Sequence, residues 1–229
     1  MRIDCHLHTS RYSGCSRLDP DTACRKALEQ GLDAVVLTEH QRQWPSEELE
    51  ALRRRFPDLS LYSGLEATLD NGVDVVVITR EQGLKIPFGL SPESFFTSQW
   101  LHSDSSYLFL AHLFRWSTAP PHGLEDMVPW VQGLEMNSVN ILRGQYHLEN
   151  GRYAPEAEAV YQDTRTRFGL QGLFNSDAHD PKAVGSLANE IPCDRPPASE
   201  TELASLIKRT TPRECQDADL LRELLFNRL

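Results

Sequence analysis

The sequence predicts an α/β fold in which short strands alternate with helices, as in a parallel sheet or a (β/α) barrel. Two observations predict it. Short apolar runs alternate with amphipathic stretches along most of the 229 residues, which is the pattern of repeated strand–helix units. In addition, His, Asp and Glu residues follow the ends of several predicted strands, where a (β/α) barrel carries its functional groups.

The first predicted elements form a regular strand–helix series. In order they are a strand at Arg2–Leu7, a helix at Asp21–Gln30, a strand at Ala34–Thr38, a helix at Ser46–Arg55 and a strand at Ser60–Leu65. The first helix has clear boundary signals, because Asp19 and Asp21 flank Pro20 at its start and Gly31 follows its end.

One antiparallel hairpin is expected to interrupt this series. Asp70, Asn71 and Gly72 separate the apolar runs LEATL and VDVVVIT, and Asn-Gly favours a type I′ turn. Later strands are predicted at Tyr107–Ala111, Gly133–Met136 and Gly172–Phe174, with helices at Pro92–Leu101, Ala154–Arg167 and Glu200–Lys208. About seven strands result. No repeat or linker marks a boundary, and Ile191–Pro197 is interpreted as a surface loop, so we expect residues 1–229 to form a single domain.

Composition limits the class of protein and its partners. No apolar run approaches the roughly 20 residues of a membrane-spanning helix, so no membrane association is expected. With 33 acidic against 23 basic residues the net charge is −10, which disfavours binding to long nucleic acid. The five cysteines form no CxxC pair and no leader segment precedes them, so a cytoplasmic location is expected.

The strongest chemical signal is the pair His6 and His8 at the end of the first strand. Because side chains alternate in a strand, Asp4, His6 and His8 share one face. Alone, such a pair is equally compatible with two hydrogen-bonded histidines and with two metal ligands.

Further metal-type ligands follow other predicted strands. They are Glu39 and His40, Glu66, His112, and Asp177 with His179. Each has an ordinary structural explanation on its own, as a loop carboxylate, a core histidine or a helix cap. Jointly they favour a metal site, because clustered carboxylates and histidines are costly unless they are paired or bound to metal.

These motifs resemble the polymerase and histidinol phosphatase (PHP) superfamily. The likeness rests on DCHLHTSRYSGCS, GLDAVVLTEH, GLE, AHLFR and NSDAH, in this order and at these strand ends, and it covers residues 1–183. It implies a distorted (β/α)7 TIM-like barrel of the PHP type, a cluster of two or three divalent ions, and metal-dependent hydrolysis of phosphoric esters. Histidines suit zinc and iron and carboxylates suit manganese, so the metal stays open among the three.

The resemblance also implies a ligand set. By that likeness His6, His8, Glu66 and Asp177 surround a first ion, and Glu66 bridges to a second ion that His112 also holds. His40 and His179 belong to a third ion.

Two positions depart from the family pattern. Gly14 stands where many members carry a further ligand of the third ion, so that site is expected to bind weakly, and the adjacent Cys15 is a candidate replacement only for a soft metal. Asn137 stands where some members carry a histidine, which leaves the second ion with fewer protein ligands.

A phosphate group also needs positive donors. Arg115 follows His112 and is the first candidate to bind the substrate and to act in catalysis, since a guanidinium can donate two parallel hydrogen bonds to phosphate. Arg11 and Arg143 are weaker candidates, for which a surface ion pair is the ordinary interpretation.

The leading hypothesis is therefore a phosphoesterase that acts on a small phosphorylated metabolite or nucleotide through a metal-activated hydroxide. Two alternatives stay open: a nuclease acting on short nucleic-acid ends, and a non-catalytic metal-binding regulatory module. The missing ligand at Gly14 keeps the second alternative open.

Overall fold

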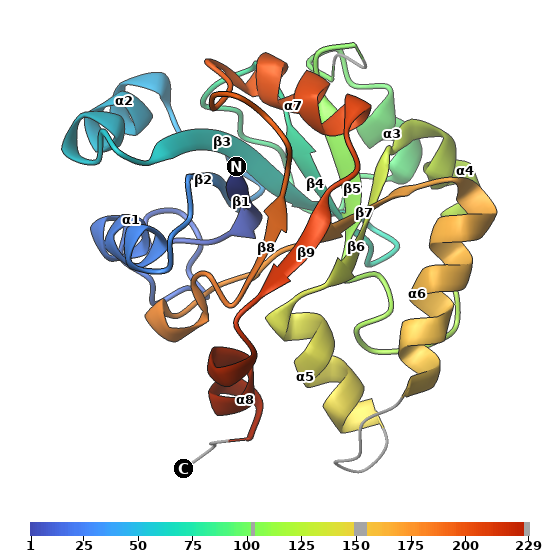
Figure 1. The fold of residues 1–229 in the computed structure, drawn as a ribbon. Helices are drawn as coiled ribbons and strands as arrows, with labels where there is room; N and C mark the ends of the chain where they lie inside the picture. Colours follow the sequence, from blue (N-terminus) through green and yellow to red (C-terminus); the bar gives the residue numbers. More distant parts are fainter. Residues whose placement is uncertain (102–103, 149–154, 227–229) are drawn as a thin grey trace.

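The computed structural model describes residues 1–101, 104–148 and 155–226. Nine strands form one sheet in the order β7-β6-β5-β4-β3-β2-β1-β8-β9, which curls into a nearly closed barrel (Figure 1). The strands are β1 (Arg2–Leu7), β2 (Ala34–His40), β3 (Ser60–Thr68), β4 (Asp74–Ile78), β5 (Tyr107–Ala111), β6 (Gly133–Asn137), β7 (Gln171–Phe174), β8 (Leu187–Glu190) and β9 (Arg213–Gln216). The expected distorted barrel is confirmed.

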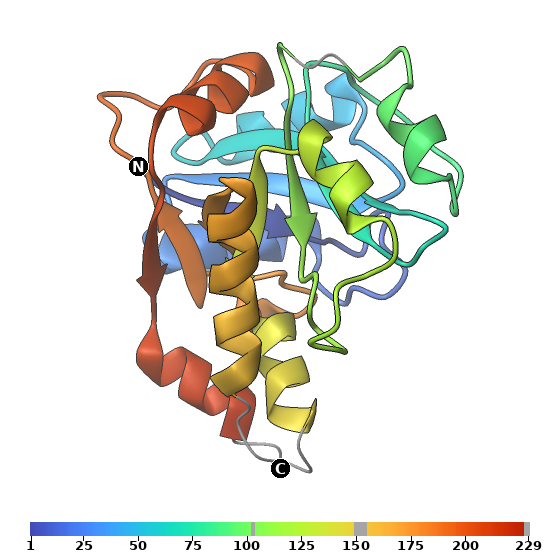
Figure 2. The ribbon, with the colours of Figure 1, turned by 90° about the vertical axis from the view of Figure 1, so that its right-hand side faces the viewer.

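Helices lie outside the sheet and at one end of it. They are α1 (Pro20–Glu29), α2 (Ser46–Arg55), α3 (Pro92–Phe96), α4 (Leu124–Met127), α5 (Val139–Leu148), α6 (Pro155–Phe168), α7 (Glu200–Arg209) and α8 (Ala218–Phe226), with 3₁₀ turns η1 (Val128–Trp130) and η2 (Pro181–Ala183). In both views α5 and α8 lie at the same end of the molecule, where they contact each other (Figure 2). No helix of the described residues is both long and apolar enough to cross a membrane.

Strand direction decides which strand ends meet. β1, β2 and β3 are mutually parallel, as are β5, β6 and β7, whereas β4 runs antiparallel to both β3 and β5. The carboxyl ends of the six parallel strands therefore lie at one end of the barrel. Because β4 runs the other way, its amino end lies there. The expected antiparallel excursion is confirmed.

The seam between β7 and β1 is tied by backbone hydrogen bonds and by side chains, among them Asn189. The Asp177 N–H donates to the His6 carbonyl at 2.9 Å, and the His8 N–H donates to the Ala178 carbonyl at 3.0 Å. The Asn189 side chain from β8 donates to the carbonyls of Phe174 and of Ile3, at 2.8 and 3.3 Å, and accepts the Phe174 N–H at 2.9 Å. These bonds hold the β1 and β7 ends next to each other.

The hairpin turn differs from the prediction. A type I′ turn needs two residues with positive φ, but among Asp70, Asn71 and Gly72 only Gly72 has one, at +79°. Leu69 donates its N–H to the Val73 carbonyl at 2.9 Å, which closes a loop of three residues. Such a loop needs a single left-handed residue, at its last position, and glycine supplies it.

Several boundaries also differ. The helix predicted at Pro92–Leu101 ends at Phe96, because the chain turns there and Trp100 packs edge-on against Phe95 with ring centroids 5.6 Å apart. The first residue of the helix predicted at Ala154–Arg167 lies outside the described residues, and α6 accounts for the rest. Helices α5 and α8 and strands β8 and β9 were not expected from the sequence.

Candidate metal centre

The side chains singled out from strand ends meet at the carboxyl end of the barrel. They are His6 on β1 and His8 just after it, His40 at the end of β2, Glu66 on β3, His112 after β5, and Asp177 and His179 after β7. The structure brings all seven together, with ring nitrogens and carboxylate oxygens at hydrogen-bond distance or slightly beyond.

Glu66 lies at the middle of this group and is 1% exposed. Its Oε1 lies 2.9 Å from His112 Nε2, and its Oε2 lies 2.9 Å from His40 Nδ1 and 3.2 Å from His8 Nε2. Burial alone raises the pKa of this carboxyl, but the nearby His6 and the bonds from His112 and His40 hold the pKa well below its ordinary value. One oxygen of Glu66 thus faces each side of the cluster, as in a carboxylate that bridges two ions.

Asp177 has an oxygen that the protein leaves without a hydrogen bond. Its buried Oδ1 lies 3.5 Å from a ring nitrogen of each of His6, His8 and His179, beyond a normal bond. Asn140 binds the other oxygen, Oδ2. An orphaned buried carboxylate oxygen surrounded by ring nitrogens fits a position that a cation completes.

The two histidines of β1 are held by a second layer of buried side chains. The Nε2 atoms of His6 and His8 are only 3.0 Å apart, while the opposite nitrogens are occupied: His6 Nδ1 lies 3.0 Å from Glu135 Oε1, and His8 Nδ1 lies 3.2 Å from Ser13 Oγ. Ser13 in turn donates to Glu39. Carboxylates behind imidazoles are typical of metal-binding histidines, because they fix the tautomer and the ring direction. Each ring therefore offers Nε2 to the cluster.

The charges of the cluster split the pKa values of its histidines. Burial lowers the pKa of His8 to about 3. Burial has the same tendency at His6 and His112, but the surrounding carboxylates outweigh it: those of Asp177, Glu135 and Glu66 raise the pKa of His6 well above its usual value, and Glu66 with Asp177 and Glu135 raises that of His112 to about 9. The negative charge of the carboxylates thus keeps His6 and His112 protonated, and divalent ions bound here would supply that positive charge instead.

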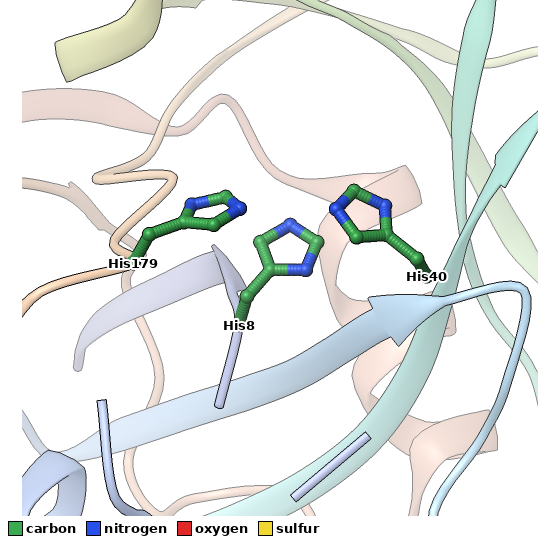
Figure 3. Close-up of side chains that lie close together, drawn as sticks. All are labelled: His8, His40 and His179. Atoms are coloured by element: carbon green, nitrogen blue, oxygen red, sulfur yellow. The ribbon is translucent and has the colours of Figure 1, made fainter. Parts of the chain in front are cut away.

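Three groups of ligand atoms could each hold an ion among the described residues. They are His6, His8 and Asp177; His6, Glu66 and His112; and His8, His40 and His179. Figure 3 shows the last group, with the His8 ring between the other two. This differs from the expected third site, which contained only His40 and His179. Because His6 and His8 each have one nitrogen to offer and each belongs to two groups, the groups share ligands and cannot fill independently.

Backbone strain marks the same place. The only non-glycine residues of the described chain with positive φ are Gln41 at 55°, His112 at 30° and Asp177 at 48°. Two of them are candidate ligands and the third directly follows His40. Such conformations cost on the order of 1–3 kcal/mol each and cluster at functional sites, where they aim side chains.

A cavity of about 330 Å³ opens over the cluster. Its wall contains Cys15, His40, Glu66, Thr68, Asp74, His112, Arg115, Asn140, Asp177 and His179. Asp74 and Asn140 were not expected from the sequence. Asp74 is the first residue of β4, and its Oδ2 lies 3.7 Å from His112 Nδ1.

The other predicted positions lie as follows. Arg115 lines this cavity, and its guanidinium stacks on the ring of Trp116, 4.3 Å from the centroid. Arg11 is paired with Glu48 at 2.7 Å, outside the cavity wall. Arg143 lines a neighbouring cavity rather than this one.

The two positions that depart from the family pattern, Gly14 and Asn137, differ in their relation to the cavity. Around Gly14 no atom lies within 4 Å of the position that a Cβ would take, so its side-chain space is open. Cys15 lines the cavity, although it belongs to none of the three groups found in the described chain. Asn137 donates to Glu214 at 2.9 Å and does not line the cavity.

Comparison with known proteins relates this barrel to solved structures. Residues 162–212 match the family model described as PHP-associated, and no curated protein matches the chain in sequence. PsfC from Pseudomonas syringae PB-5123 is similar in structure, with a TM-score of 0.68 and 18% identity over 96% of this chain and 93% of that one.

Two further structures share the fold. A two-domain protein from Bacteroides vulgatus ATCC 8482, containing a predicted PHP-like metal-dependent phosphoesterase, has a TM-score of 0.65 and 15% identity over 98% of this chain and 68% of that one. An amidohydrolase from Chromobacterium violaceum, with bound sulfate and no metal, has a TM-score of 0.52 and 16% identity over 96% and 99%. At these identities the likeness shows a common fold.

Proposed function

We infer that the chain is a metal-dependent hydrolase of the PHP superfamily, an assignment that its fold and its PHP-associated segment support. We propose that it hydrolyses phosphoric esters of a small metabolite or nucleotide. One observation carries the proposal. Seven histidines and acids from the ends of five strands converge beneath a cavity whose wall also contains an arginine. The solved relative that contains a predicted PHP-like metal-dependent phosphoesterase supports the same activity.

The ligand atoms fit two or three divalent ions. Glu66 presents one oxygen to His6 and His112 and the other to His8 and His40, which suits a bridging carboxylate. The orphaned Asp177 Oδ1 completes a group with His6 and His8. Mixed imidazole and carboxylate donors suit zinc, manganese or iron.

The protein's own residues would orient the substrate around those ions. When bound, the ions polarise a phosphoryl oxygen and lower the pKa of water, so that hydroxide is available near pH 7. Arg115, on the wall of the cavity, can donate two parallel hydrogen bonds to the remaining phosphate oxygens. Its stacking on Trp116 restricts the guanidinium before the substrate arrives.

Helix α5 sets the position of Arg115. A Cβ on Gly144 would lie 2.2 Å from the Arg115 carbonyl oxygen, so only glycine lets the helix approach this loop so closely. Replacing Gly144 by alanine should displace Arg115 and raise KM for a phosphoric ester while metal content stays at the wild-type level. Equal KM values would show that Arg115 does not need this position.

The main test combines elemental analysis with a screen for phosphate release. The full chain is loaded with zinc, manganese or iron and assayed on phosphomonoesters, phosphodiesters and short oligonucleotides. We expect His6→Ala and Asp177→Ala to lose metal and activity together, because each removes a ligand. Arg115→Ala should retain metal and raise KM, whereas Arg54→Ala, an exposed arginine on α2, should change neither.

The outcomes separate the alternatives. Release of phosphate from small esters supports the proposal, and cleavage of oligonucleotides alone favours the nuclease. Full metal loading without hydrolysis of any ester would contradict the proposal and favour a non-catalytic metal-binding module.

A further inference from the structure

A second cavity of about 470 Å³ adjoins the metal centre. It shares two wall residues, Cys15 and His179, with the cavity above the cluster. The two cavities therefore adjoin at these two side chains. Nothing in the proposed hydrolysis uses this second space.

The second cavity reverses the charge balance of the protein. Acids outnumber bases by 33 to 23 in the whole chain, but here the wall carries three cations, Arg17, Arg143 and Lys182, against the acids Asp180 and Glu223. A local excess of positive charge on an acidic protein attracts anions to that place. The cations come from three separate segments, the loop after β1, helix α5 and turn η2.

The two acids leave an excess of one positive charge among the Arg, Lys, Asp and Glu side chains of this wall. Asp180 already accepts the Lys182 N–H at 3.0 Å, because it caps the short turn η2. Glu223 lies 3.7 Å from Lys182 Nζ, and both side chains are more than half exposed, so this pair is weak. An anion of the substrate can therefore replace Glu223 as the partner of Lys182.

The wall is also tied to the metal centre. The Arg17 N–H donates to the His179 carbonyl at 2.9 Å, and Ser16 Oγ donates to the carbonyls of His8 and His179 at 3.0 and 3.3 Å. The backbone of Arg17 is therefore fixed relative to His179, and through Ser16 relative to His8. A molecule whose phosphate lies at the cluster would reach this wall across His179.

We propose that the Arg17, Arg143 and Lys182 cavity binds a second oxyanionic group of the substrate, either phosphate or carboxylate. The proposal rests on the proposed function and narrows it to small phosphoric esters with an anion at the far end of a short chain. Arginine suits both oxyanions, because its planar fork donates two hydrogen bonds at once.

The test compares esters that differ only at the far end. The metal-loaded full chain is assayed on 3-hydroxypropyl phosphate, 3-phosphooxypropionate and 1,3-propanediol bisphosphate, and on the same series with longer chains. We expect kcat/KM to rise roughly tenfold or more when a second anion is present, since hydrogen bonds to charged groups contribute about that much. The carboxylate and bisphosphate members show which oxyanion is preferred.

Variants locate the effect. In the double variant Arg17→Ala/Arg143→Ala, the ratio of kcat/KM for the two-anion ester to kcat/KM for the one-anion ester should fall towards one. Arg54→Ala removes an exposed arginine on α2, and in this variant the ratio of the two kcat/KM values should stay as in the wild type. A preference that is absent in the wild type, or that survives the double variant, overturns the proposal.

A binding measurement keeps this test separate from the proposed activity. Calorimetry compares propylphosphonate with 1,3-propylenediphosphonate, neither of which can be hydrolysed. If no ester is cleaved but the diphosphonate binds tenfold tighter in the wild type than in the double variant, the proposed activity fails and the second oxyanion site stands. If esters are cleaved and both phosphonates bind equally, the proposed activity stands and the second oxyanion site fails.

Discussion

Replacing Glu135 by glutamine tests how the cluster holds His6. Glu135 is fully buried on β6 and accepts from three directions: its Oε1 faces His6 Nδ1 at 3.0 Å and Asn175 Nδ2 at 2.9 Å, and its Oε2 accepts the His112 N–H at 3.1 Å. Glutamine keeps the shape but replaces one acceptor oxygen by an NH₂ group. Whichever way the amide turns, at least one buried donor loses its acceptor.

The expected size follows from these contacts. If the amide oxygen stays near His6 and Asn175, the His112 N–H faces the NH₂ group, and one unsatisfied buried donor costs about 1–3 kcal/mol of unfolding free energy. For metal binding, loss of the carboxylate behind His6 should weaken affinity by about 10- to 100-fold, as for other partners of metal-binding histidines. That corresponds to about 1.4–2.8 kcal/mol of binding free energy.

Two measurements check this prediction. Competition with a chromogenic chelator gives the zinc affinity of the full chain, and urea unfolding with excess chelator gives the stability of the metal-free protein. The matched control is Glu190→Gln, the same change on an exposed residue of β8 paired with Arg213 at 3.1 Å, which should cost less than about 1 kcal/mol. A Glu135→Gln protein with zinc affinity within twofold of the wild type would refute the orienting role.

Three further predictions concern the barrel seam, the protons of the cluster and the cysteines. Asn189→Ala should lower the free energy of unfolding by about 2–4 kcal/mol in urea titrations, because several buried backbone groups lose their partner; a loss under 1 kcal/mol would contradict this. Metal loading at pH 7 should release protons, because His112, with a pKa of about 9, must lose its proton to bind; calorimetry in buffers of different ionisation enthalpy should show the release falling as pH rises through 9, and a pH-independent value would refute it. Iodoacetamide should modify exposed Cys15 before buried Cys24, whose pKa burial raises to about 12; equal rates by mass spectrometry would argue against this order.

The sequence was informative where side chains follow strands. His6 and His8 could be placed on one face from strand alternation alone, and the structure has both rings converging with 3.0 Å between their Nε2 atoms. Strand ends also pointed to Glu66, His112 and Asp177. The spatial gathering of these residues could be predicted because parallel strands of one sheet must end on the same side.

The supporting residues were harder to predict. Glu135 occupies the middle of the strand segment GLEMN, and the only signal was a charged residue inside an apolar run. Helix α5 was missed because Gly144 lowers helix propensity. Glycine is required at this position because the helix lies against the Arg115 loop. Strands β8 and β9, with sequences LANE and RECQ, are too short and polar to show alternation. Arg11 illustrates a further limit, since closeness to His8 in sequence did not bring it to the cavity wall.

The reversed direction of β4 has a consequence for how this barrel could acquire new specificity. β4 starts at Asp74, on the cavity wall, so the three-residue loop before it lies near the entrance. Asn71 in that loop donates to the carbonyl of His122, in the segment between β5 and α4, at 2.9 Å. Doubling the length of a flexible loop costs only about 0.6 kcal/mol of closure entropy. Insertions at this hairpin could therefore reshape the entrance and select other substrates, while every ligand-bearing strand end keeps its register.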